Sequence, residues 1–118
     1  MPLTVVSAVC CENVSATWPY TLERVRFRWA SPPDEFCVWV QVQNLSEKSF
    51  TWRFEVTRVS DLVYASEDEL ILSGSTRVER FARFQGADLE AKTYRLNVVL
   101  NDVVASSFLI DLGSKELP

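Results

Sequence analysis

The sequence predicts an all-β protein that folds as a sandwich of two sheets. Apolar and polar residues alternate with a period of two over most of the chain, which is the pattern of half-buried strands. Turn-forming residues interrupt the alternation at intervals close to the roughly 8–12 residues typical of sandwiches and barrels. With 118 residues the chain has the size of one domain, so we expect a single domain over 1–118 with seven or eight mainly antiparallel strands.

The first half of the chain contains four of the expected strands. The segment LERVRFRWA shows the pattern well, because Val25, Phe27 and Trp29 alternate with arginines. A polar link, NLSEKS, has the length of a hairpin loop and separates the third strand from the fourth. The four expected strands cover 3–11, 22–30, 35–43 and 49–57.

The second half contains four more expected strands in two pairs. Gly74-Ser75 separates 69–73 from 76–84, and Asn101-Asp102 separates 93–100 from 103–112. Both dipeptides are signals for two-residue turns. A brief turn around 86–90 is the only helical candidate, and it is too short to change the fold class.

Composition and charge exclude several classes of function. The net charge is −4 and the pI is about 4.8, whereas nucleic-acid-binding surfaces carry a basic excess. No apolar run approaches the ~20 residues of a membrane helix, and no basic residue precedes the apolar N-terminal run, as it would in a secretory signal. Three irregularly spaced cysteines are a poor disulfide framework, so we expect free thiols in a cytoplasmic protein.

The residue types also argue against catalysis. The chain contains no histidine, which removes the usual nucleophile systems and the commonest zinc ligand. Cys10 and Cys11 are adjacent and point to opposite faces of a strand, so they make a poor metal pair. With three glycines the chain has no glycine-rich phosphate loop. We therefore expect no enzymatic activity, no metal and no cofactor.

The end of the chain carries a family resemblance. Tyr94 begins a late strand, where it is either the tyrosine corner of a Greek-key sandwich, bonded to upstream backbone, or an ordinary core tyrosine. The stretch KTYRLNVVLNDVVASSFLIDL, with the strand 76–84, resembles the last three strands of immunoglobulin-like domains. The chain also resembles a group of small uncharacterised bacterial proteins with that fold. The resemblance implies an immunoglobulin-like Greek-key sandwich, but without the inter-sheet disulfide, because no cysteine lies two residues after Tyr94.

The strand 35–43 raises the main functional question. Its residues at even positions are all apolar and form a buried face, yet Trp39 lies on the opposite face together with Cys37. A tryptophan on the outer face of a sheet is a large apolar side chain, and other residues usually shield it from water. Either another segment of this chain, such as 12–21 or 60–69, covers it, or a partner protein does.

The last hairpin raises a related problem of parity. A two-residue loop at Asn101-Asp102 pairs Leu100 with Val103 and drives Phe108 outward, since a shift of one residue exchanges the two faces of a strand. A longer loop or a bulge restores the inward position of Phe108 and leaves Val99 and Val103 outward. In both cases we expect one apolar outer patch made of Trp39, Cys37, Val99 and Val103.

Two functions compete on these grounds. An apolar outer patch predicts a binding or assembly module that acts through a sheet face or edge, with a protein partner or a second copy of the chain. The alternative is a ligand-binding module for carbohydrate or a cation. Exposed aromatic rings at Trp18 and Tyr20 would stack on a sugar, and the acidic residues Glu67, Asp68 and Glu69 would supply oxygen ligands.

Overall fold

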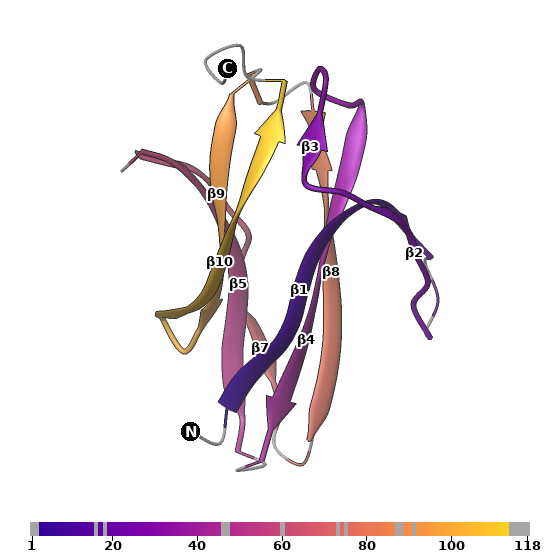
Figure 1. The fold of residues 1–118 in the computed structure, drawn as a ribbon. Helices are drawn as coiled ribbons and strands as arrows, with labels where there is room; N and C mark the ends of the chain where they lie inside the picture. The colour runs from indigo at the N-terminus through magenta and orange to yellow at the C-terminus, as the bar shows by residue number, and fades with distance from the viewer. Residues whose placement is uncertain are drawn as a thin grey trace.

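The structure is a sandwich of two β-sheets (Figure 1). It is a computed structural model and describes residues 3–15, 17, 19–45, 48–59, 61–72, 74, 76–86, 89–90 and 92–113. The predicted all-β class is confirmed, and these ranges contain no α-helix. Among the same residues there is no helix with the length and apolar character needed to cross a membrane.

The first sheet has four strands in the order β2-β1-β4-β8, and all neighbours are antiparallel. β4 is a central strand, with β1 on one side and β8 on the other. The strands are β1 (Leu3–Val14), β2 (Leu22–Val25), β4 (Glu35–Asn44) and β8 (Arg77–Gln85).

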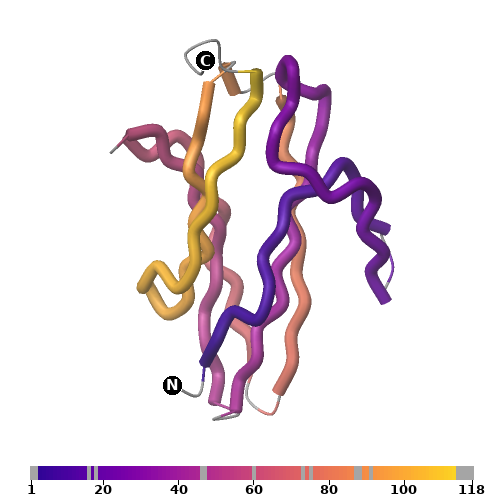
Figure 2. Tube along the Cα trace, in the orientation of Figure 1, coloured from indigo at the N-terminus to yellow at the C-terminus, as the bar shows by residue number. Residues whose placement is uncertain are grey.

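The second sheet has six strands, of which five follow the order β3-β10-β9-β5-β6 and the sixth, β7, also pairs with β5. All its pairs are antiparallel except β3 with β10. The chain (Figure 2) passes from the first sheet to the second between β2 and β3, between β4 and β5, and between β8 and β9. The strands are β3 (Arg28–Trp29), β5 (Phe50–Arg58), β6 (Asp61–Ala65), β7 (Glu69–Ile71), β9 (Thr93–Leu100) and β10 (Val103–Leu112).

The core lies between the two sheets and is built by alternate residues of the central strands. Each of these side chains is almost fully buried, and burial of an aliphatic or phenyl side chain stabilises the fold by about 1.5–3 kcal/mol. The contacts between the sheets therefore depend on the inward faces of β4, β5 and β9. Their core residues are Phe36, Val38, Val40, Val42, Phe50, Trp52, Phe54, Val56, Tyr94, Leu96, Val98 and Leu100.

Two of the expected hairpins are wrong. β4 and β5 lie in different sheets, and so do β7 and β8. A short polar link predicts a turn, but a link between two sheets and a link within one sheet have similar lengths and compositions. The neighbours of β4 are instead β1 and β8, which are distant in sequence and complete a sheet that covers the core.

The expected strand 22–30 is divided between the sheets. Its first part, β2, pairs with β1, and its second part, β3, pairs with β10. The break follows Val25, and the preceding residue, Arg24, has a φ of 53°, which lies outside the extended region. As a result, Val25 is 51% exposed although the alternation predicts burial, while Trp29 is buried as expected.

The last hairpin is confirmed, and a bulge solves its parity problem. Asn101 and Asp102 form a two-residue turn with φ values of 50° and 63°, as a type I′ turn requires. The register shifts between Val104 and Ser106, and Phe108 then packs against the core. Val103 is paired with the inward-facing Leu100, yet it lies beside the turn and its side chain is 65% exposed, as expected for this residue.

Tyr94 forms the hydrogen bond expected of a tyrosine corner. Its ring is buried, and its hydroxyl donates to the backbone carbonyl oxygen of Glu90 at 3.0 Å. Burial raises the pKa of Tyr94, and the bond to Glu90 opposes that change. The bond ties the start of β9 to the link that follows β8.

Tyr94→Phe should destabilise the fold, because it removes this donor from a buried site. We expect the free energy of unfolding to fall by about 1 kcal/mol, as for a typical buried hydrogen bond, with little change in the dependence on denaturant. Urea denaturation followed by tryptophan fluorescence measures the change. An unchanged midpoint would show that the hydroxyl contributes nothing to stability.

Candidate functional site

The four residues predicted to form one outer patch do not lie together. Trp39 and Cys37 belong to β4 in the four-stranded sheet, whereas Val99 and Val103 belong to β9 and β10 in the other sheet. Cys37 and Val99 are also buried, at 0% and 2% exposure. The expected single patch is therefore wrong.

Trp39 is instead part of a second, smaller cluster on the outer face of the four-stranded sheet. Cys37 lies directly opposite Cys11 of β1, and both thiols are buried. Tyr20 packs edge-on against Phe81 with ring centroids 5.2 Å apart. The cluster contains Cys11, Val14 and Cys37, with Tyr20, Leu22, Trp39 and Phe81 packed around them.

The chain itself therefore covers part of the cluster to which Trp39 belongs, and the Trp39 side chain is half-buried. The covering side chains Tyr20 and Leu22 come from the link between β1 and β2 and from the start of β2. The indole Nε1 of Trp39 donates to the Glu79 carboxylate at 3.2 Å, which satisfies its polar atom. Of the two covering segments considered, 12–21 contributes to the cluster, whereas 60–69 lies in or beside the other sheet.

Arg83 holds the rim of this cluster together. Its guanidinium donates to the Asn13 side chain at 2.6 Å, to the backbone oxygen of Val14 at 2.8 Å and to the Glu35 carboxylate at 3.2 Å. It also lies 3.5 Å from the Cys37 sulfur. One side chain thus ties β1, β4 and β8 together on the outer face.

The environment of the thiols makes them unreactive. Burial, followed by the charge of Cys37, raises the pKa of Cys11 to about 11. Burial also raises the pKa of Cys37, although the nearby Arg83 guanidinium opposes the change. Cys10 faces the main core, and burial raises its pKa too. Since the thiolate is the reactive form, all three cysteines are structural.

The residues of the alternative ligand site are not brought together either. Trp18 lies outside the described residues, and Tyr20 is packed in the cluster on the four-stranded sheet. Glu67, Asp68 and Glu69 lie at the link between β6 and β7, beside the other sheet. Within the described ranges, no group of three cysteine or carboxylate side chains is arranged to hold a metal ion.

Two of these carboxylates are already bound by the chain. Asp68 pairs with Arg53 at 3.0 Å. Glu69 accepts from the Trp52 indole at 2.6 Å and from Arg80 at 3.0 Å. The Glu69 contacts join β7 to β8 across the side of the sandwich, so this carboxylate holds the sheets together.

The structure reveals a different candidate site at the edge of the six-stranded sheet. β6 is the last strand of that sheet, and all five of its residues are exposed. Its hairpin with β5 extends away from the body of the sandwich at the left of Figure 1. Leu62, Val63 and Tyr64 are 58%, 43% and 44% exposed. An exposed apolar edge strand is a surface that can pair with another chain.

Local interactions explain how β6 forms. Ser66 anchors its end, because its hydroxyl accepts from the Phe54 amide at 2.8 Å and its amide donates to the Phe54 carbonyl at 2.9 Å. Val59, at the hairpin turn, has a φ of 59°, which is rare for a β-branched residue. Sequence reasoning missed β6 because the turn has no glycine or asparagine to announce it.

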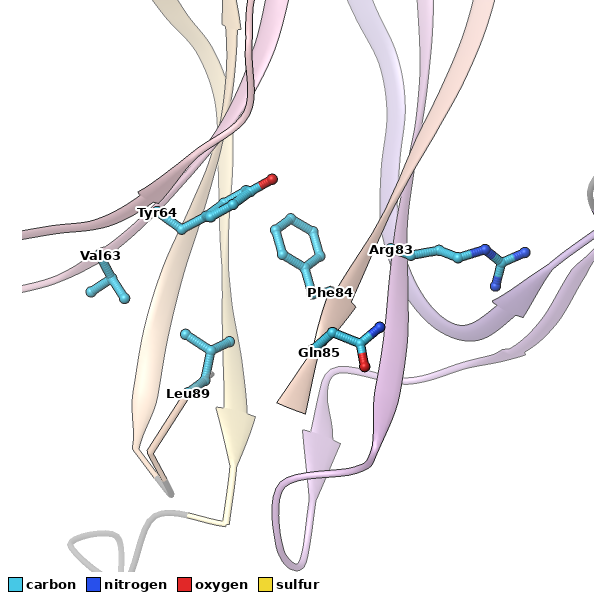
Figure 3. A pocket seen from close by; sticks show the side chains of 6 residues that line it. All are labelled: Val63, Tyr64, Arg83, Phe84, Gln85 and Leu89. Atoms are coloured by element: carbon cyan, nitrogen blue, oxygen red, sulfur yellow. The ribbon is translucent and has the colours of Figure 1, made fainter. Parts of the chain in front are cut away.

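A small pocket lies between β6 and β8, which are edge strands of the two sheets. Tyr64 of β6 and Phe84 of β8 meet edge-on with ring centroids 5.2 Å apart, and Val63 and Leu89 complete the apolar wall (Figure 3). Arg83 and Gln85 also border the pocket, but the Arg83 guanidinium points away from it. The pocket volume is about 220 Å³.

The end of β8 is held in place beside this pocket. The Gly86 amide donates to the Asp34 carbonyl at 3.0 Å, and its α-carbon lies so close to Pro33 that a side chain at position 86 would overlap the Pro33 carbonyl oxygen. The Gly86 carbonyl in turn accepts from the Leu89 amide at 3.1 Å. These contacts hold the end of β8 and the Leu89 backbone next to the pocket.

Acidic groups lie close to the same edge. Arg53 binds Asp102 at 2.7 Å, Glu55 at 2.9 Å and Asp68 at 3.0 Å. Hydrogen bonds to Asp102, Asp68 and Glu55 raise the pKa of Arg53. One positive charge among three carboxylates leaves a surplus of two negative charges. Glu55 and Asp68 lie at the Ala65 end of β6, whereas Asp102 lies across β5 at the turn between β9 and β10. Arg58 is opposite Asp61 at the other end of β6, so the negative surplus is next to the Ala65 end.

Trp39→Glu should destabilise the fold, because it places a carboxylate beside Glu79 and inside an apolar cluster. We expect a loss of about 1–3 kcal/mol, seen as a lower thermal midpoint in calorimetry. Gln43→Glu is the control, since it adds the same charge to the same face of β4 opposite Arg77. A normal midpoint for Trp39→Glu, with a dimer dissociating in sedimentation, would instead identify Trp39 as a contact between two chains.

The thiols should resist a maleimide at neutral pH in the folded protein and react fully after unfolding. The folded state holds the Cys11 proton more tightly than the unfolded state, whose thiol pKa is about 8.5. The free energy of unfolding should therefore fall as the pH rises above that value. Cys11→Ala/Cys37→Ala should reduce this fall, and rapid labelling of the native protein would contradict the assignment.

Comparisons with known proteins support the fold only. No protein-family model and no curated protein matches the chain. Among solved structures the chain is similar to a crystal structure of β-glucosidase from Listeria innocua in complex with glucose, at 11% identity and a TM-score of 0.56. The match covers 95% of this chain and 16% of the glucosidase chain. Because the identity is so low, the likeness shows only that this chain and part of the glucosidase chain share a fold. It carries no information about function.

Proposed function

We propose that the chain is a binding module that recognises an extended segment of a partner protein by pairing it with the edge of β6. The observation that carries this proposal is the exposure of all five β6 residues at the end of a sheet. An edge strand presents a row of backbone donors and acceptors, and a peptide in extended conformation is complementary to that row.

The composition of β6 supports the proposal. Natural proteins protect an edge strand with lysine, proline, inward-pointing charges or bulges. The β5–β6 pair has a bulge, but the β6 sequence DLVYA has no lysine, no proline and no inward-pointing charge within its apolar run. The register between β5 and β6 shifts between Val56 and Thr57. Leu62, opposite Thr57, is therefore on the outer face, and Tyr64, opposite Val56, is on the inner face. A paired strand would therefore find apolar contacts on both faces of the sheet.

The size of the neighbouring pocket favours a peptide over a small molecule. Sites for small molecules usually have volumes of about 300–1,000 Å³, whereas this pocket has about 220 Å³. A space of that size suits a single apolar side chain. The buried free thiols support a cytoplasmic location, where cysteines stay reduced.

A selection from a phage-displayed library of random peptides tests this function. We expect the selected peptides to contain alternating apolar residues and to bind the wild type in a fluorescence polarisation titration. Leu62→Lys should weaken binding at least about tenfold, because lysine at an edge opposes strand pairing. Amide resonances of β6 should shift on binding.

Leu109→Lys is the matched control. Leu109 is 55% exposed against 58% for Leu62, and it lies on β10 of the same sheet, away from the β6 edge. This variant should bind the peptides as the wild type does. The proposal fails if the library yields no binders, or if binding is lost in Leu109→Lys and kept in Leu62→Lys.

A further inference from the structure

We infer that the segment paired with β6 belongs to a different protein and carries lysine or arginine residues beside an apolar residue. This inference rests on the proposed function and names the chemistry of the partner. Three features lead to it: the acidic surroundings of the edge, the charge distribution along β6 itself, and the apolar pocket between Tyr64 and Phe84.

The first feature is the uncompensated negative charge beside the edge. Glu55, opposite Ala65 of β6, is one of the three carboxylates that share Arg53. Asp102 and Asp68 are the other two, and they are 79% and 51% exposed. Asp102 lies at the turn between β9 and β10, across β5 from β6, whereas Glu55 and Asp68 lie next to the end of β6. These two carboxylates share one guanidinium and keep free lone pairs, so a cationic side chain from a paired strand can bind them.

The second feature, the excess of acidic over basic residues at the two ends of β6, disfavours a second copy of this chain even though Asp61 is opposite Arg58 of β5. β6 begins at the exposed Asp61 and is followed by the exposed Glu67 and Asp68. In a two-fold symmetric antiparallel pair, Asp61 of each copy would lie close to Glu67 and Asp68 of the other copy. The repulsive contact would therefore occur twice. Like charges facing each other across paired strands are destabilising, and each chain has a net charge of −4. A partner with basic residues at those places meets attraction instead.

The third feature is the position of the pocket. It lies between β6 and β8, on the inner side of the strand edge, because Tyr64 is opposite the inward-facing Val56. Side chains of an added strand point alternately outward and inward. An inward one next to Tyr64 therefore enters the pocket and covers the exposed part of the Tyr64 ring. A leucine-sized apolar side chain fits this wall of Val63, Tyr64, Phe84 and Leu89.

Three synthetic peptides test the inference. They share a centre of alternating valine and threonine with one leucine, and they differ in flanks of lysine, glutamine or glutamate. We expect the lysine peptide to bind the wild type at least about tenfold more tightly than the glutamate peptide at low salt. The difference should shrink as salt screens the charges. Replacing the leucine by serine should weaken binding about tenfold or more.

Two double variants provide matched controls. Asp61→Asn/Glu67→Gln should reduce the preference for lysine, whereas Glu12→Gln/Glu23→Gln, which removes two carboxylates from β1 and β2 of the other sheet, should preserve it. Equal binding of the three peptides, all lost in Leu62→Lys, would overturn this inference and leave strand pairing intact. Binding by no peptide would overturn the proposed function itself. A wild-type dimer that Leu62→Lys dissociates would identify a second copy as the partner.

Discussion

The burial of the inner face of β4, together with Cys37 on its outer face, is the constraint on which the rest of the structure depends. Its inward residues Phe36, Val38 and Val40 enter the main core, and its outward residues Cys37 and Trp39 enter a second cluster. A strand with buried residues on both faces must be central, so β1 and β8 flank it. The link between β1 and β2 then folds over part of the outer face, where Trp39 is half-buried.

Most of the exposed large apolar residues in strands belong to the other sheet, although Val6 of β1 and Val25 of β2 are also exposed. The four-stranded sheet uses its own chain to cover part of its outer face, and Arg83 closes the rim of that cover. In the six-stranded sheet, β6 lies at the end and extends away from the body (Figure 2). A free backbone edge, an apolar pocket and a surplus of negative charge therefore coincide at one side of the molecule.

Contacts close to β6 also join the two sheets on this side of the sandwich. The Glu69 carboxylate joins Trp52 of β5 and Arg80 of β8, and thus closes part of the side between the sheets. Beyond this closure, Tyr64 and Phe84 leave a pocket that the chain does not fill. Carboxylates that sequence reasoning assigned to a cation site therefore act in part as bonds between sheets and in part as the acidic border of an edge.

The sequence by itself determined the all-β class and the last hairpin, because both depend on local signals: a period of two and the Asn101-Asp102 turn. It left Tyr94 as either a tyrosine corner or a core residue, and the hydrogen bond to Glu90 in the tertiary structure identifies the corner. Only the tertiary structure decided which strands pair, since hydrogen bonds between strands join segments distant in the chain. It placed Trp39 in an internal cluster, separated Cys37 from Val99, and brought Tyr64 to Phe84. The candidate site is made of contacts between segments that are distant in the sequence. A local sequence pattern does not predict contacts of this kind.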